Sequence, residues 1–211
     1  MSEKVRTVDK EAWTPKTQLG LLVKNGEITA LEQIFDMRKP ILEPEIVDII
    51  IPNMEVETLN DKTTQRVTDS GKRTQFRVLV VVGDYHGHVG LGVGKSEELK
   101  PALESAVRNG KLNMISVISG CGSWECKCQF KHSLPQKTQG KEGSTLVTLR
   151  PAPRGLGLAS NDVVKKVLSM AGIKDVWSSS MGGGNIYNMA VATIMALYNL
   201  NALKPAPTKE Q

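Results

Sequence analysis

The stretch QFRVLVVVGDYHGHVGLGVGKSEELKPALESAVRNGK, residues 75–111, decides the fold. Its first ten residues predict a buried β-strand, because every second position places an apolar side chain on the same face. The next segment, residues 88–95, alternates apolar residues with glycines and predicts a second strand. Residues 96–111 predict a helix that Ser96 caps and Gly110 ends. This order indicates an α+β sandwich with a helix on one face of the sheet.

The segments on either side extend this unit to a domain over residues 46–118. EIVDIIIPNMEVETL predicts another apolar strand, and LNMISVI predicts a short one. Residues 1–45 are expected to be an extension with one short helix at ITALEQIFDM, where Thr29 and Glu32 match a capping box. A helix this short is marginal alone, so its apolar stripe is expected to dock on another surface.

A second domain is expected over residues 143–200. The helix NDVVKKVLSMAG, with Ser160 as its cap and Gly172 at its end, separates two strands, and the apolar helix IYNMAVATIMALYNL completes the domain. The pattern therefore predicts a βαβα unit. A connector over residues 119–142 joins the two domains, and residues 201–211 are expected to form a flexible tail.

The composition indicates a folded protein with a polyanionic partner. Forty per cent of the 211 residues are apolar, enough for a buried core. No apolar run is long enough to cross a membrane and no hydrophobic segment follows the N-terminal charges, so we expect a cytoplasmic protein with no membrane partner. Residues 1–60 carry a net charge of −4 (7 basic against 11 acidic residues), whereas residues 61–211 carry +9 (20 against 11). A basic body favours a partner such as RNA, and a solvated basic surface is the alternative.

The chain lacks the motifs of catalysis and nucleotide binding. GKS at residues 94–96 matches the end of a phosphate-binding loop, but that loop needs a glycine where Val89 stands. The spacing from Gly90 also departs from the dinucleotide-binding pattern. Neither a Gly-x-Ser-x-Gly elbow nor a His-Glu-x-x-His pair occurs. We therefore expect neither an enzyme nor a nucleotide cofactor.

Several basic residues stand where phosphate contact is favoured. SGKRTQF predicts a hairpin whose exposed tip carries Lys72 and Arg73. The prolines of RPAPRG hold a loop extended, so its two arginines cannot easily fold back. The glycine strip permits close approach of another backbone, either that of RNA or that of the following helix. The candidate RNA-binding residues are Lys72, Arg73, Arg77, Gly90, Gly92, Gly94, Lys95, Arg108, Lys111, Arg150 and Arg154.

All three cysteines lie within eight residues of the segment SGCGSWECKCQFKH, and a histidine follows them. A stable disulfide is rare in a reducing cytosol and would leave one thiol unpaired, and the redox C-x-x-C spacing is absent. Three thiolates and one imidazole are a standard ligand set for structural zinc. The predicted zinc ligands are Cys121, Cys126, Cys128 and His132. Zinc would fix a connector that has little hydrophobic core, and three cysteines without a ligand are the alternative.

Long motifs of this chain resemble a known family. DSGKRTQFRVLVVVGDYHGHVGLGVGKSEELKPALESAVRNGKLNMISV resembles the N-terminal domain of the ribosomal small-subunit protein five family, the S-five family. GSTLVTLRPAPRGLGLASNDVVKKVLSMAGIKDVWSSSMGGGNIYNMAVATIMAL resembles its second domain. The leader WTPKTQLGLLVKNGEITALEQIF and the cysteine-containing insert resemble the archaeal branch. Together the motifs cover about residues 11–200.

The resemblance implies more than the residue spacing does. It implies a double-stranded-RNA-binding-like domain followed by a left-handed βαβ domain, in a structural component of the small ribosomal subunit. Such a component binds ribosomal RNA, contacts small-subunit proteins four and eight, lines the path by which messenger RNA enters and supports translational accuracy. Lys72 and Arg73 match the family's loop associated with accuracy. Two alternatives remain, a small-molecule kinase that uses the second-domain fold and an RNA-binding module outside the ribosome.

Overall fold

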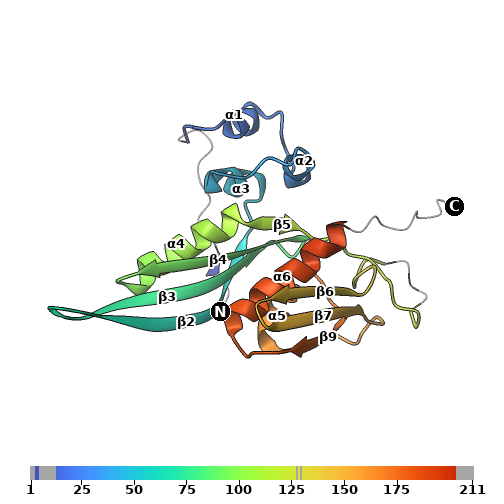
Figure 1. Cartoon of the computed structure of the whole chain (residues 1–211). Coiled ribbons are helices and arrows are strands. Elements are labelled where there is room, and N and C mark those ends of the chain that lie inside the picture. Colours follow the sequence, from blue (N-terminus) through green and yellow to red (C-terminus); the bar gives the residue numbers. More distant parts are fainter. Residues whose placement is uncertain (1–2, 5–12, 127, 129, 203–211) are drawn as a thin grey trace. The chain divides into compact units, whose positions relative to one another are not determined.

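The computed structural model describes residues 3–4, 13–126, 128 and 130–202, and these residues form two compact units (Figure 1). The first unit contains the described residues up to Asp84 together with Gly90–Met114. The second contains Tyr85–Val89 and the described residues from Ile115 onward. The tail predicted for residues 201–211 lies, from residue 203 on, outside the described residues.

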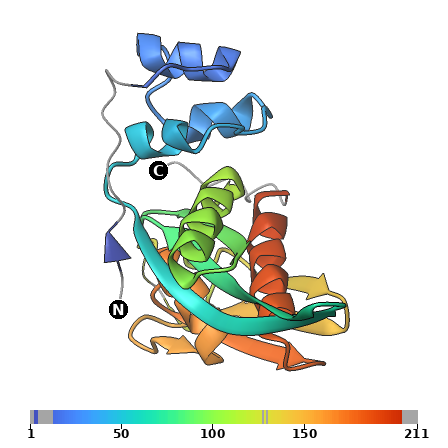
Figure 2. The same cartoon turned by 90° about the vertical axis from the view of Figure 1, so that its left-hand side faces the viewer.

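The first unit is built on a five-stranded sheet in the order β1-β2-β3-β4-β5, with helix α4 along one face (Figure 1, Figure 2). Strands β2 and β3 form a long antiparallel hairpin whose register runs from Glu55 opposite Gly83 to Thr68 opposite Gly71. The predicted hairpin, strands and helix are therefore present. The elements are β1 (Glu3–Lys4), β2 (Glu55–Thr68), β3 (Gly71–Gly83), β4 (His88–Ser96), α4 (Leu99–Leu112) and β5 (Met114–Ser116).

The glycine strip of β4 lies directly under α4. A Cβ added at Gly90, Gly92 or Gly94 would come closer than 3.0 Å to backbone atoms of the helix. Gly110 belongs to this contact and lies inside α4, so the prediction that it ends the helix is wrong. The prediction that Ser96 caps the helix is also wrong, because Ser96 is the last residue of β4 and Glu98 precedes the helix.

Among the described residues, three helices lie between β1 and β2, where the sequence predicts one. They are α1 (Gln18–Asn25), α2 (Leu31–Asp36) and α3 (Pro44–Ile50). The segment EIVDII is helical rather than a strand, because Pro44 begins the helix and Ile46, Val47 and Ile50 recur at helical spacing. At α2 the Thr29–Glu32 capping box does not form. Instead the Thr29 backbone N–H donates to the Gln33 side-chain oxygen, at 3.2 Å.

The leader shares one hydrophobic core with the sheet. Leu31 and Ile34 of α2 are buried in the same cluster as Val78, Val80 and Val82 of β3. The apolar stripe of α2 therefore docks on the domain, as predicted. Glu43 fixes the entrance to α1, because one of its carboxylate oxygens accepts the backbone N–H groups of Lys16 and Thr17 at 2.8 and 2.7 Å.

The second unit contains a four-stranded sheet in the order β6-β7-β9-β8, with helices α5 and α6. Strands β8 and β9 are parallel and α5 connects them, which forms a βαβ unit. Its first strand, β8, lies in the segment predicted as a loop, whereas the predicted strand before the helix is β7, which pairs with β9 in antiparallel orientation. Asn161 rather than Ser160 caps α5, since its side chain accepts from the Val163 N–H. The elements are β6 (Thr138–Glu142), β7 (Thr145–Pro151), β8 (Leu158–Ala159), α5 (Asp162–Met170), β9 (Val176–Met181) and α6 (Ile186–Ala202).

Within the described parts of the chain, no helix has both the length and the apolar character needed to span a membrane.

Candidate metal centre and cationic surfaces

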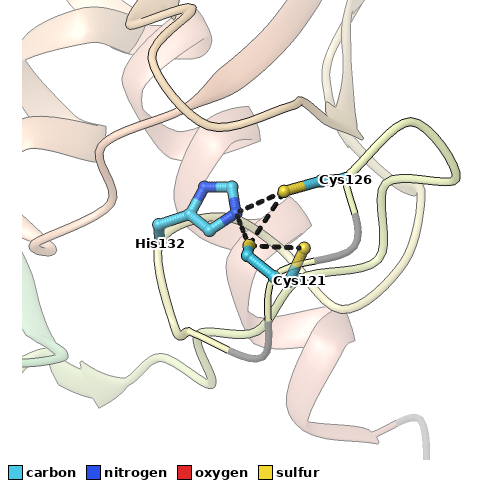
Figure 3. Close-up of side chains that lie close together, drawn as sticks. Cys121, Cys126 and His132 are labelled. Carbon is cyan, nitrogen blue, oxygen red and sulfur yellow. Dashed lines mark hydrogen bonds between the residues drawn. The ribbon is translucent and has the colours of Figure 1, made fainter.

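The connector brings the three cysteines and His132 into one cluster (Figure 3). One ligand atom from each of the four residues lies within 4.8 Å of the other three. The Cys128 sulfur is 2.8 Å from that of Cys126, 3.5 Å from that of Cys121 and 3.1 Å from the His132 Nε2. The distance from the Cys126 sulfur to the same nitrogen is 3.7 Å.

Short backbone contacts hold the two arms of the connector together. Gly120 and Ser133 form an isolated antiparallel bridge, with N–H···O distances of 2.7 and 2.8 Å. The Gly122 N–H donates to the Leu134 carbonyl at 3.0 Å. A Cβ at Gly122 would collide with the Pro135 backbone, so this close approach requires glycine. The bridge sets Cys121 and His132 next to each other although eleven positions separate them.

His132 is oriented by a buried carboxylate. Its Nδ1 lies 2.8 Å from the Asp175 Oδ2, and both side chains are only 6% exposed. The Lys174 and Asp175 N–H groups also donate to the His132 carbonyl, at 3.0 and 3.1 Å. A carboxylate on Nδ1 leaves the Nε2 lone pair free for a metal, the arrangement common at metal-binding histidines. Asp175 was missed by sequence reasoning because it stands 43 residues from His132 and matches no ligand spacing.

The thiols differ in their acidity. Hydrogen bonding from Cys128, together with the Arg154 and Cys128 backbone N–H groups, lowers the pKa of Cys126 to about 6. Burial, with contributions from the neighbouring thiols, raises the pKa of Cys121 to about 11. N–H groups aimed at sulfur favour a thiolate, which is the form that binds metals.

The four residues fit a tetrahedral zinc ion. With zinc–sulfur bonds of about 2.3 Å, two ligand sulfurs in a tetrahedron lie about 3.8 Å apart. The observed sulfur separations of 2.8 and 3.5 Å are slightly shorter, so the cluster would open by about 1 Å or less around an ion. The ligands are complete without water, which is typical of a structural rather than a catalytic site.

A second feature is a row of cations on the β2–β3 hairpin. Arg66 lies opposite Arg73, and Lys62 lies opposite Arg77. Because side chains alternate along a strand, positions four residues apart share a face, so all four cations lie on the same face of the ribbon. All four are exposed, as is Lys72 at the tip. We call Lys62, Arg66, Arg73 and Arg77 the hairpin cation row. Sequence reasoning missed Lys62 and Arg66, which only the register places beside the predicted residues.

The hairpin cation row contains two like-charge cross-strand pairs. Like charges directly opposite on a sheet destabilise it. Arg73 is partly compensated, since its guanidinium donates to the Glu97 carboxylate in an exposed ion pair. An arrangement of this kind favours a ligand that supplies negative charge along the ribbon.

Four of the predicted RNA-binding residues are buried inside the first unit rather than exposed on its surface. Lys111 is 6% exposed, and its amine lies 2.7 Å from one Asp48 carboxylate oxygen and 2.6 Å from the other. Lys111 therefore forms an ion pair in the core, where its amine is not accessible to RNA. The glycine strip of Gly90, Gly92 and Gly94 is buried under α4, which leaves no room for RNA on that face. The sequence allows either RNA or the following helix to lie against the glycine strip, and in the structure it is the helix α4.

The remaining predicted residues are exposed. In the first unit, Lys95 of β4 and Arg108 of α4 are both exposed to solvent. In the second unit, Arg150 of β7 is exposed and stands opposite Trp177 of β9. The Arg154 guanidinium lies over the Phe130 ring, 5.4 Å from its centroid. The GKS segment is extended strand β4 rather than a loop, so it does not form a phosphate cradle.

Exposed cations on stiff elements, and a closed Cys/His centre in the second unit, favour a structural, nucleic-acid-binding class of protein. Comparisons with known proteins identify the class more closely. The family description "Ribosomal protein S5, N-terminal domain" matches residues 54–118, and "Ribosomal protein S5, C-terminal domain" matches residues 140–209.

Full-length relatives agree with these matches. A protein of Methanococcus maripaludis named small ribosomal subunit protein uS5 is 47% identical over 98% of this chain and 90% of its own length. Proteins of the same name from Staphylothermus marinus and Methanocaldococcus jannaschii are each 50% identical, over 91% and 90% of this chain and 92% and 88% of their own lengths. The chain therefore belongs to the ribosomal protein S5 family, as its motifs predict, and these relatives are archaeal. This family is one of ribosomal structural proteins and not of enzymes.

Proposed function

We propose that this chain is a structural component of the small ribosomal subunit, in cytoplasmic ribosomes, and that it binds ribosomal RNA. Membership of the S5 family supports the proposal, and the hairpin cation row is the structural observation on which the RNA-binding part mainly rests. Two like-charge cross-strand pairs on a two-stranded ribbon are unfavourable, and RNA phosphates would add negative charge along it. A ribbon that exposes both strands can lie along an RNA backbone without reading its bases.

The rest of the RNA contact is assigned to exposed cations only. In the first unit these are the hairpin cation row with Lys72, Lys95 and Arg108, and in the second unit Arg150 and Arg154. Lys111 and the three strip glycines are not included, because each has a structural partner within the chain. Arginine forks on stiff elements suit bidentate contact with phosphate oxygens.

We further propose that the hairpin tip faces messenger RNA as it enters the subunit and supports translational accuracy, with small-subunit proteins four and eight as neighbours. The tip is a two-residue turn in which the Thr68 hydroxyl donates to the Gly71 carbonyl at 2.9 Å, so Lys72 and Arg73 stand on a defined support. Lys72→Ala with Arg73→Ala should raise misreading in a reporter assay without unfolding the protein. An unchanged error rate would count against a role in accuracy but not against RNA binding.

The metal that we propose for the connector is zinc. The Cys3His set, the N–H···S contacts and the Asp175-oriented imidazole support a closed four-ligand site. Native mass spectrometry of protein purified without chelator should give the mass of one bound zinc. Cys126→Ser should lose it, whereas Ser123→Ala, three residues away, should retain it. An apo mass with three readily alkylated thiols would refute the zinc centre.

Sedimentation tests the proposed function most directly. Cell lysate is run on a sucrose gradient before and after a high-salt wash, and the chain is followed by mass spectrometry. Stoichiometric sedimentation with the small subunit after the wash is expected. A chain that leaves the subunit in salt would instead be an RNA-binding module outside the ribosome.

Salt dependence tests the hairpin cation row. The logarithm of the association constant for purified small-subunit ribosomal RNA should fall linearly with the logarithm of salt concentration. Lys62→Ala with Arg66→Ala should reduce that slope by about 0.7–0.9 per cation removed. Lys39→Ala, an exposed cation in the acidic leader, is the matched control and should leave the slope unchanged. Equal effects of the control and the hairpin variant would refute the assignment.

A further inference from the structure

The metal centre is joined by three separate contacts to the segment that carries Arg154. The Arg154 backbone N–H donates to the Cys126 sulfur. The Arg154 guanidinium lies over the ring of Phe130, which stands between the last cysteine and His132. The third contact runs through Asp175, the carboxylate that orients His132.

Asp175 divides its two oxygens between the metal centre and the arginine loop. Oδ2 faces the His132 Nδ1, whereas Oδ1 accepts the N–H groups of Gly155 and Gly157 at 3.1 and 2.8 Å. Asp175 is 4% exposed, so these hydrogen bonds form away from water and are correspondingly costly to lose.

Two backbone hydrogen bonds also hold the loop, from the Leu156 N–H to the Pro153 carbonyl at 3.4 Å and from the Val176 N–H to the Gly157 carbonyl at 3.2 Å. Gly155 and Gly157 adopt positive φ angles of 90° and 77°, a conformation that favours glycine, and a Cβ at either would meet nothing within 4 Å. Side-chain packing does not impose this conformation, and the hydrogen bonds to Asp175 are the contacts that tie both glycine N–H groups to the metal centre. Arg154, Gly155 and Leu156 are all exposed.

We propose that Asp175 couples the metal centre to residues 153–157, so that this loop holds Arg154 in place for RNA only when the centre is loaded with metal. This inference rests on the proposed function for its RNA partner. As a metal ligand, His132 would be held in one orientation, and through its contact with Asp175 it would hold the carboxylate that accepts the two glycine N–H groups. Without the metal, the imidazole and the Cys126 sulfur would both be released, which would loosen the Cys126 contact with the Arg154 N–H and the Asp175 contact with Gly155 and Gly157. Asp175 acts as a positioning residue and does not touch RNA.

Hydrogen exchange of the glycine amides tests the coupling without RNA. Removing zinc from the full-length protein with a chelator, under reducing conditions, should speed exchange at Gly155 and Gly157 by about tenfold or more. Amides in α6 should keep their protection, which shows that the domain remains folded. Unchanged glycine exchange would overturn the proposal, and so would loss of protection in α6, because the metal would then hold the whole domain rather than the loop.

Two substitutions at Asp175 separate its contact with His132 from its contacts with Gly155 and Gly157. In Asp175→Asn the Oδ1 can still accept from both glycines, but the amide nitrogen donates to the His132 Nδ1 and puts the imidazole proton on Nε2. Zinc affinity, measured by competition with a chromophoric chelator, should fall about 10- to 100-fold. Asp175→Ala should lose zinc affinity and glycine protection together. Asp162→Asn removes an exposed carboxylate from α5 and should change neither. Unchanged zinc affinity in Asp175→Asn would refute the role of Asp175.

The RNA arm uses purified small-subunit ribosomal RNA. Arg154→Ala should weaken binding of the zinc-loaded protein about tenfold, and chelation should weaken the wild type by a similar factor. Chelation of Arg154→Ala should add little, because both changes remove the same contact. Full additivity would overturn the coupling. Failure of the zinc-loaded wild type to bind RNA would refute the proposed function instead, and the exchange result would still decide the coupling.

Discussion

Lys111→Met tests the reassignment of Lys111 from RNA to the core. The Lys111 amine contacts both oxygens of Asp48, and the two side chains are 8% and 7% exposed. The substitution keeps an unbranched side chain of similar length but leaves the Asp48 carboxylate buried without its cation. Breaking one side of a buried ion pair costs about 3–5 kcal/mol at neutral pH. RNA affinity per folded molecule should not change.

The loss should depend on pH. Burial raises the pKa of Asp48 above its ordinary value of 3.8, and Lys111 opposes this shift through its hydrogen bond and its charge. Without Lys111 the pKa rises further. A carboxyl whose folded-state pKa exceeds its unfolded value favours folding below the unfolded pKa and loses that contribution as the pH rises through the folded pKa. The deficit of the variant should therefore be smallest at acidic pH and grow toward neutrality.

Urea denaturation followed by tryptophan fluorescence can report the first unit alone. Trp13 is buried in its core, and the other two tryptophans, Trp124 and Trp177, belong to the second unit. A background with both of these changed to Phe makes Trp13 the single reporter. The free energy of unfolding is then compared between about pH 5 and pH 8.

Two control variants decide the outcome. Lys100→Met, at an exposed lysine on the same helix, should cost little at any pH. Asp48→Leu combined with Lys111→Met removes both charges and should recover most of the stability, because no unpaired charge stays buried. A deficit independent of pH, or a double variant as unstable as Lys111→Met alone, would refute the reasoning.

Three further predictions follow from single contacts. Gly92→Ala places a Cβ against the α4 backbone and should cost about 1–3 kcal/mol or more in thermal denaturation. Gly184→Ala meets nothing within 4 Å and should change stability by less than about 1 kcal/mol. Asn161→Ala should cost about 1 kcal/mol in urea denaturation through loss of the α5 cap, and a larger effect of Ser160→Ala would contradict the observed cap. In metal-free protein at neutral pH, iodoacetamide should alkylate Cys126 before Cys121, because a pKa of about 6 leaves Cys126 largely thiolate and a pKa of about 11 keeps Cys121 protonated. Peptide mass spectrometry gives the order, which should level out as the pH approaches 11, and the reverse order would contradict these assignments.

Local pattern determined the secondary structure wherever one periodicity was clear. The period-two run of β3 and the apolar periodicity of α2 are visible in the chain, and both elements occur. The set of three cysteines and one histidine was also evident, because its members lie close together in sequence. The prediction from pattern was wrong at EIVDII, because a short apolar run fits a strand and a buried helix equally well. Packing of this segment on the core selects the helix.

Tertiary structure decided which polar residues face outward. Lys111 looks like any surface lysine until α3 places Asp48 beside it, 63 positions away in sequence. Gly110 resembles a helix end, yet it lies inside α4, where a Cβ would come within 2.8 Å of the Val82 side chain of β3. Strand register places Lys62 and Arg66 beside Arg77 and Arg73. Asp175 reaches both His132 and the arginine loop only in the folded chain. Each of these contacts joins residues distant in sequence, and periodicity reports only which face of an element is buried, not what that face meets.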